Sequence, residues 1–271
     1  MKSAVTISLV PEARGGPFVF WDDLAASCAH AAELGFDAVE IFPASAQALD
    51  AANVARLLGM HGLKCATIGT GAGWVKHKLR LTDPDAAVRQ KAIGFVGEII
   101  DAAGTFGAPA IIGSMQGRWE AGVTREQALA WLGEALATLA DRAVHHGVPL
   151  LYEPLNRYES NLFNRQGEAV SFLRSLNLRN VKLLCDLFHM NIEESSIADT
   201  LRLVGPLVGH VHFVDSNRQA MGWGHTDMAP IMAALREINY TGYLSAEVLP
   251  LPDSVSAAQQ TMKSFRRWAA A

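Results

Sequence analysis

Four ionisable side chains in the second half of the sequence have the residue types and spacing of a metal site. Each follows an apolar, strand-forming run, and they are Glu153, Asp186, His212 and Glu247. The gaps between them are 33, 26 and 35 residues, about the length of one strand plus one crossover helix. Four successive strands of a parallel barrel would bring one such side chain each to the same end of the barrel.

Three carboxylates and one imidazole that converge on one point could bind a divalent cation. On a rigid frame with open coordination positions, such a cation supports catalysis, so the set predicts an enzyme. Taken alone, any one of these residues is more often a helix cap or a carboxylate at the rim. Four of them at consecutive strand ends are harder to explain that way, because these are the catalytic positions of a barrel.

The elements that would position these residues are marked by a recurring pattern of amphipathic helix, glycine and short β-branched run. Glycines at 35, 62, 107 and 147 suit helix ends, where the backbone turns left-handed. The runs that follow lack polar alternation, which is typical of strands buried on both faces. Strands are therefore predicted at residues 4–9, 37–41, 64–69, 109–113, 149–153, 181–185, 208–214 and 242–247.

Helices are predicted at residues 22–34, 84–105, 125–146, 165–176 and 227–238. Asp83-Pro84 and Thr124 are expected to start two of them. The alternation predicts an α/β protein, one (β/α)8 TIM-barrel domain over residues 1–271, with its active site at the C-terminal ends of strands 5–8. A doubly wound sheet is the alternative, but VPEARGGPF after the first strand lacks the glycine-rich phosphate turn.

The composition excludes several classes of protein. Half of the 271 residues are hydrophobic and the net charge is −4, so nothing favours binding to nucleic acid or to anionic membranes. No stretch approaches the ~18 apolar residues of a membrane helix. The cysteines Cys28, Cys65 and Cys185 show no paired spacing, which fits a reducing compartment. We expect a cytoplasmic protein.

Three further polar side chains lie close to the predicted ligands in the sequence. His189 follows Asp186 by three residues and could hydrogen-bond a substrate oxygen. Arg218 has several donors with which to hold an oxygen-rich ligand, and Glu159 is a similar candidate. For each of them an ordinary surface position is the alternative.

Other histidines and tryptophans near the predicted strand ends have weaker signals. His210 lies two residues before a predicted ligand, on the same side of the strand, and is expected to be a core histidine or a donor behind the ligands. Trp74, Trp119 and Trp223 lie in predicted loops, where aromatic faces could line a sugar site or pack on the rim.

The sequence resembles the sugar isomerases and epimerases of the xylose-isomerase-like barrel superfamily, and most closely the ketose 3-epimerases of the D-tagatose/D-psicose/L-ribulose type. The motifs that carry the resemblance are EPLNRYESNLFN (153–164), CDLFHMNIEE (185–194), HVHFVDSNRQAMGWGHTD (210–227) and SAEV (245–248). These motifs are specific indicators of the metal site and of the superfamily, and less specific indicators of which substrate is bound. Asp215 stands where these epimerases usually carry glutamate.

The resemblance implies a role for each candidate residue. The implied metal ligands are Glu153, Asp186, His212 and Glu247, the two glutamates being also the catalytic acid/base pair. The implied substrate-binding residues are Glu159, His189 and Arg218. The resemblance also implies one divalent ion, Mn²⁺, with Mg²⁺ or Co²⁺ as substitutes, and an oxygen-rich ligand set agrees with that.

The implied reaction is inversion of C3 of a free ketose through a cis-enediolate. One glutamate would remove the C3 proton and the other would return a proton on the opposite face, while the ion polarises the carbonyl. Alternatives are an aldose–ketose isomerase of the same superfamily, a sugar dehydratase or lyase, and a non-catalytic partner subunit. An endonuclease IV-like DNA repair enzyme is disfavoured, because the strand ends ATIGTG and IIGSMQ lack its extra zinc-binding histidines.

The expected partner is therefore a small-molecule sugar, with no nucleic acid and no membrane, and the expected assembly is a homodimer or homotetramer. Phosphosugar sites on barrels commonly use the loops after strands 7 and 8. Those loops carry Arg218 but no further basic cluster, which favours an unphosphorylated substrate.

Overall fold

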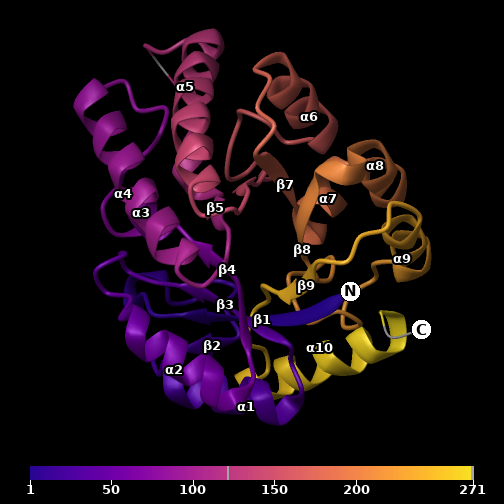
Figure 1. The fold of residues 1–271 in the computed structure, drawn as a ribbon. Coiled ribbons are helices and arrows are strands. Elements are labelled where there is room, and N and C mark those ends of the chain that lie inside the picture. Colours follow the sequence, from indigo (N-terminus) through magenta and orange to yellow (C-terminus); the bar gives the residue numbers. More distant parts are fainter. Residues whose placement is uncertain (121, 270–271) are drawn as a thin grey trace.

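The computed structural model, which describes residues 1–120 and 122–269, is a closed barrel of parallel strands surrounded by helices (Figure 1). The ring runs in the order β1-β3-β4-β5-β6-β7-β8-β9, and pairing of β1 with β9 closes it. The short strand β2 (Phe20–Trp21) pairs with β1 beside the ring. The predicted α/β barrel is confirmed.

The eight strands of the ring alternate with helices along the chain. The strands are β1 (Lys2–Ser8), β3 (Ala38–Phe42), β4 (Lys64–Gly69), β5 (Ala110–Ile112), β6 (Leu150–Tyr152), β7 (Val181–Asp186), β8 (Val208–His212) and β9 (Tyr243–Ala246). The helices are α1 (Leu24–Leu34), α2 (Ala51–His61), α3 (Ala72–Val75), α4 (Ala86–Gly104), α5 (Arg125–Val144), α6 (Gln166–Ser175), α7 (Leu187–Glu193), α8 (Ile197–Val204), α9 (Met228–Glu237) and α10 (Ser254–Trp268).

The predicted strands coincide with the observed ones within two residues at each end. They form where the sequence predicts because their side chains are apolar on both faces; Val5, Ile41 and Ile112 are fully buried. The small differences between the predicted and the observed strand ends affect the position of two site residues. Glu153 and Glu247 lie directly after β6 and β9 instead of inside them, so they stand in the loops at the carboxyl ends.

The helix boundaries agree with most of the expected caps. Glycines at 35, 62, 107 and 147 all have positive φ angles. Thr124 begins α5 with a capping box that it completes with Gln127. The predicted start at Asp83-Pro84 is wrong, because the side chain of Asp83 binds Arg80 and the carboxylate of Asp85 caps α4 instead.

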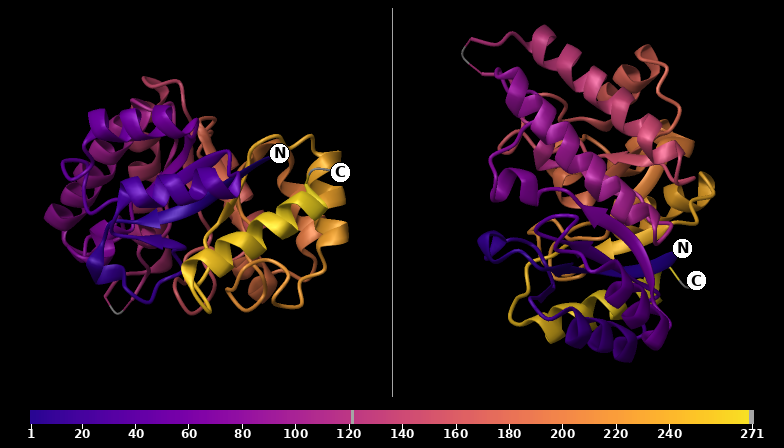
Figure 2. Two further views of the ribbon diagram at one scale, coloured as in Figure 1. Left: turned by 90° about the horizontal axis from the view of Figure 1, so that it is seen from below. Right: turned by 60° about the vertical axis from the view of Figure 1, so that its left-hand side comes forward.

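The helices form the outer layer and pack their apolar faces on the ring (Figure 2). The first strand and the last helix, α10, lie side by side, so both ends of the chain contribute to closing the barrel. No helix within the described ranges is long and apolar enough to span a membrane.

Candidate metal centre and active site

The four predicted ligands meet at the carboxyl end of the ring. Asp186 and His212 are the last residues of β7 and β8 and are paired in register, while His212 is also paired with Ser245 of β9. Glu153 and Glu247 follow β6 and β9 directly. One ligand atom from each of the four side chains lies within 4.8 Å of the others, so the cluster could hold a divalent metal ion.

The imidazole of His212 lies at the centre of this cluster. Its Nδ1 is 3.1 Å from Asp186 Oδ2, 3.3 Å from Glu247 Oε2 and 3.5 Å from Glu153 Oε1. Burial opposes a charge on this ring, but Glu247 and Glu40 outweigh burial and raise its pKa well above the usual value. Three carboxylates around one nitrogen concentrate negative charge, which a metal cation would offset.

Glu153 fits the role of a metal ligand. Its Oε1 atom is buried and accepts no hydrogen bond from any described residue. Burial raises the pKa of Glu153 to about 8. A buried carboxylate oxygen without a partner is costly, and coordination to a divalent ion would remove that cost. The donor set of three carboxylates and one imidazole also suits a hard divalent ion.

The two carboxylate oxygens of Asp186 have different roles, one in capping a helix and one in the site. Oδ1 accepts hydrogen bonds from the backbone N–H groups of Phe188 and His189 and so begins α7. Oδ2 faces the cluster, where Arg218 Nη1 donates to it at 2.7 Å. Burial alone would raise the pKa of Asp186, but Arg218 and His189 outweigh burial and hold it far below the usual value.

Arg218 contacts the cluster directly. Besides Asp186 it donates to Glu247 Oε2, and its guanidinium lies 4.8 Å from the centre of the Phe188 ring. Its loop is organised by Asp215, whose buried carboxylate accepts hydrogen bonds from backbone N–H groups of the loop. Asp215 therefore stabilises the loop that carries Arg218.

His189 lies in helix α7, which was not predicted from the sequence; the cap at Asp186 starts this helix directly after β7. Asn156 Nδ2 is 2.7 Å from His189 Nδ1, and the Asn156 backbone N–H also donates to that nitrogen at 3.4 Å. With Nδ1 accepting, the hydrogen of the neutral ring is on Nε2. Nε2 lies 3.8 Å from Asp186 Oδ2, so its N–H is available to a ligand in the cavity.

Glu159 is the most exposed of the predicted site residues, with 51% of its side chain accessible. Its Oε1 accepts a hydrogen bond from Asn156 Nδ2 at 2.9 Å. Asn156 therefore positions both Glu159 and His189, which line the same cavity. The roles of Glu159, His189 and Arg218 in substrate binding stay predictions.

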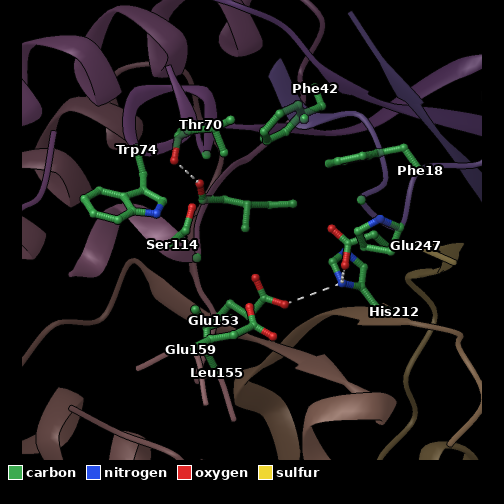
Figure 3. A pocket seen from close by; sticks show the side chains of 18 of the residues that line it. Phe18, Phe42, Thr70, Trp74, Ser114, Glu153, Leu155, Glu159, His212 and Glu247 are labelled. Atoms are coloured by element: carbon green, nitrogen blue, oxygen red, sulfur yellow. Dashed lines mark hydrogen bonds and ion pairs between the residues drawn. The ribbon is translucent and has the colours of Figure 1, made fainter. Parts of the chain in front are cut away.

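The cluster opens into a cavity of about 540 Å³, within the ~300–1,000 Å³ of small-molecule sites. Figure 3 shows Glu153, His212 and Glu247 on one side of it and an aromatic wall on the other. Phe18 and Phe42 pack with ring centres 4.6 Å apart. Residues on this wall come from the first half of the chain.

Of the three loop tryptophans in the sequence, Trp74 lines the cavity and is part of helix α3. Trp119 and Trp223 are not among the residues that line it. Trp119 is held elsewhere, because its indole N–H donates to the backbone oxygen of Asn161 at 3.1 Å.

Two residues of the site have no counterpart in the sequence predictions. Glu40, in the middle of β3, is 4% exposed and lines the cavity. It contacts the metal-site histidine from the side opposite the carboxylates, with Oε1 3.2 Å from His212 Nε2. Ser114, just after β5, lines the cavity beside Trp74 (Figure 3). Only Ser114 follows a strand end, which was the available signal for that residue.

Residues 28–268 match the sequence pattern of the family described as Xylose isomerase-like TIM barrel. The chain belongs to this family. It is similar to the D-psicose 3-epimerase of Agrobacterium fabrum, with 34% identity over 80% of this chain and 76% of that protein. It is also similar to the L-ribulose 3-epimerase of a Methylomonas species, with 31% identity over 81% of this chain and 76% of the relative.

A solved structure has the same architecture as this chain. The D-allulose 3-epimerase from Methylomonas sp. superposes with a TM-score of 0.80 and 27% identity, covering 98% of each chain. The similarity therefore extends over the whole barrel. It includes the strand ends that carry the four clustered side chains.

Proposed function

We propose that this protein is a metal-dependent epimerase that inverts C3 of a free ketose. The observation that carries the proposal is a pair of glutamates, the buried Glu153 and the partly buried Glu247. They face one cavity from the loops after β6 and β9, on either side of Asp186 and His212. Relatives that match most of the chain are named D-psicose and L-ribulose 3-epimerases, which supports the same reaction here.

The ion would be held by Glu153, Asp186, His212 and Glu247, and when bound it would supply Lewis-acid polarisation of the substrate carbonyl. One glutamate takes the proton from C3 of the sugar, giving an enediolate, and the other delivers a proton to the opposite face. The two carboxylates have different surroundings, because Glu247 is paired with Arg218 whereas Glu153 Oε1 has no hydrogen-bond partner among the described residues. Such an asymmetric pair suits one acid and one base.

The remaining cavity residues would bind and orient the sugar. His189 donates from Nε2 to a substrate oxygen, and Arg218 and Glu159 contact further hydroxyl groups. The aromatic wall of Phe18, Phe42 and Trp74 covers the apolar C–H surface of the sugar and limits access of water. We propose Mn²⁺ as the ion, with Mg²⁺ or Co²⁺ as substitutes, because the ligands are mainly oxygen. The homodimer or homotetramer and the cytoplasmic location stay predictions.

The reaction is tested by incubating the Mn²⁺-loaded protein with a panel of free and phosphorylated ketoses in D₂O. We expect an epimeric ketose with deuterium at C3. An aldose product labelled at C2, or a dehydrated product, would replace the proposal with the isomerase or the dehydratase of the same family.

The metal site is tested separately from turnover. In crystals soaked with Mn²⁺, we expect one anomalous peak within coordination distance of the four side chains Glu153, Asp186, His212 and Glu247. In solution, removal of the ion by a chelator should abolish epimerisation, and Mn²⁺ should restore it. A peak elsewhere, or full activity of the metal-free protein, would contradict the site.

Substitution of Arg218 by alanine should raise KM at least tenfold, because its guanidinium lines the cavity directly beside the clustered carboxylates. Mn²⁺ affinity should stay equal or increase, since loss of this cation leaves Asp186 and Glu247 freer to bind the ion. Steady-state kinetics and Mn²⁺ titration measure the two effects. Arg202→Ala is the control, because Arg202 also binds two carboxylates but lies on the outer helix α8.

Substitution of His189 by alanine should lower kcat/KM through loss of one hydrogen bond to the substrate, worth about 0.5–1.5 kcal/mol if neutral. The smaller effect relative to Arg218 follows from the neutral ring, whose pKa is lowered by burial. Unchanged kinetics in both variants would show that these two residues belong to the rim and not to the binding site.

A further inference from the structure

A second cluster of ionisable groups lies inside the barrel and shares His212 with the four predicted ligands. It consists of Glu40 of β3 and of His210 and His212 of β8, all of them buried. Glu40 is separated from the two histidines by 170 and 172 residues in sequence, and the closure of the ring brings them together. The reaction proposed above assigns no role to Glu40.

The carboxylate of Glu40 contacts both imidazoles through the same ring nitrogen. Oε2 lies 2.9 Å from His210 Nε2 and Oε1 lies 3.2 Å from His212 Nε2. A carboxylate only accepts hydrogen bonds, so both Nε2 atoms must carry a hydrogen. By the same argument Nδ1, which lies 3.1 Å from Asp186 Oδ2, carries a hydrogen when no metal ion is bound. Loss of that hydrogen leaves a lone pair on Nδ1, and Nδ1 is the atom that faces Asp186, Glu153 and Glu247.

We propose that Glu40 is a positioning residue that fixes the tautomer and the ring orientation of His212, so that Nδ1 is presented to the metal ion. A hydrogen bond from the second nitrogen of a metal-binding histidine to a carboxylate orients the ring and increases its strength as a ligand. The inference rests on the metal site of the proposed function and is independent of the substrate.

The burial of Glu40, His210 and His212 supports a role for Glu40 in metal binding. The side chains of Glu40, His210 and His212 are each no more than 6% accessible, so water cannot replace their hydrogen bonds. A structural carboxylate would need only to satisfy two buried donors. Here one of the donors is Nε2 of His212, and the other nitrogen of that ring, Nδ1, lies in the proposed metal centre. The property that separates the two roles is therefore the affinity for the metal ion.

The test is Glu40→Gln, which keeps the shape of the side chain but offers one acceptor and one donor. A glutamine can accept from only one of the two Nε2 atoms, and where its NH₂ group faces His212 the ring hydrogen must move to Nδ1. Mn²⁺ affinity, measured by calorimetric titration, should fall by about 10–100-fold. His210→Gln is the matched control, because it removes the other histidine, leaves the contact between Glu40 and His212, and should keep Mn²⁺ affinity within about threefold.

A second measurement needs no variant. In the Mg²⁺-loaded wild-type protein, nitrogen-15 spectra should show His212 with a slowly exchanging hydrogen on Nε2 and none on Nδ1. A hydrogen on Nδ1, or equal Mn²⁺ affinity of Glu40→Gln and wild type, would overturn the inference, and so would an equal loss in His210→Gln. If wild type binds Mn²⁺ and Glu40→Gln does not, but neither epimerises a ketose, the proposed reaction fails while the role of Glu40 stands.

Discussion

Replacement of either glutamate of the pair, Glu153→Gln or Glu247→Gln, is expected to abolish epimerisation. Glutamine keeps the volume of the side chain but cannot take up or release the C3 proton. The loss should reach at least the ~10²–10⁴-fold typical of general acid–base groups, with a further loss where metal binding weakens. Turnover is measured with the ketose identified in D₂O, at Mn²⁺ concentrations that give equal occupancy of each variant.

A labelling experiment separates proton transfer from metal binding in these variants. With one glutamate intact, the enzyme should still exchange the C3 hydrogen of one of the two epimers with D₂O, without inverting it. Glu153→Gln and Glu247→Gln should therefore show opposite preferences between the epimers. Near-normal kcat in either variant with confirmed metal occupancy would remove that glutamate from the mechanism. Glu237→Gln is the control, since Glu237 pairs with Arg202 on the outside of the barrel.

The substitution Gly113→Ala should be nearly as damaging, although no side chain is lost. A Cβ atom built at Gly113 would lie 2.5 Å from Glu153 Oε2, well inside contact distance. The backbone cannot easily give way, because Gln116 Nε2 donates to the carbonyl oxygens of Gly113 and Glu153 at 3.0 and 2.9 Å. The carboxylate must therefore move, and a displacement of about 1 Å can cost ~10²-fold in rate.

Steady-state kinetics, Mn²⁺ titration and thermal unfolding together test this prediction. We expect kcat/KM and Mn²⁺ affinity to fall while the barrel stays folded, because the clash is confined to one side chain. Gly59→Ala is the matched control, since Gly59 lies in helix α2 and a Cβ there meets no atom within 4 Å. An active Gly113→Ala variant would show that the position of Glu153 is not critical.

The four clustered side chains could be found from sequence because each directly follows an apolar run. In a parallel ring the ends of neighbouring strands are adjacent, so strand prediction alone brings Glu153, Asp186, His212 and Glu247 together. The order of the strands needs no further information, since consecutive strands pair. The same reasoning explains why the fold class could be predicted although the short helices α3 and α7 were missed.

Glu40 could not be found in the same way. In FDAVEIF it reads as one polar residue in a buried strand, and its partners are more than 160 residues away in the sequence. Its importance appears only when β3 and β8 face each other across the interior of the ring. Helix α7 was missed for a local reason, because no glycine separates it from β7 and the Asp186 carboxylate alone starts it.

The aromatic wall and the clustered carboxylates belong to different parts of the chain. Phe18, Phe42 and Trp74 come from the first third of the sequence, whereas the proposed acid/base pair comes from loops after β6 and β9. The three wall positions can therefore be varied while the sequence of the second half, with the acid/base pair, stays unchanged. Directed evolution of this barrel could draw on that separation, with randomised codons at the wall positions and an unchanged second half, to obtain catalysts for new sugars.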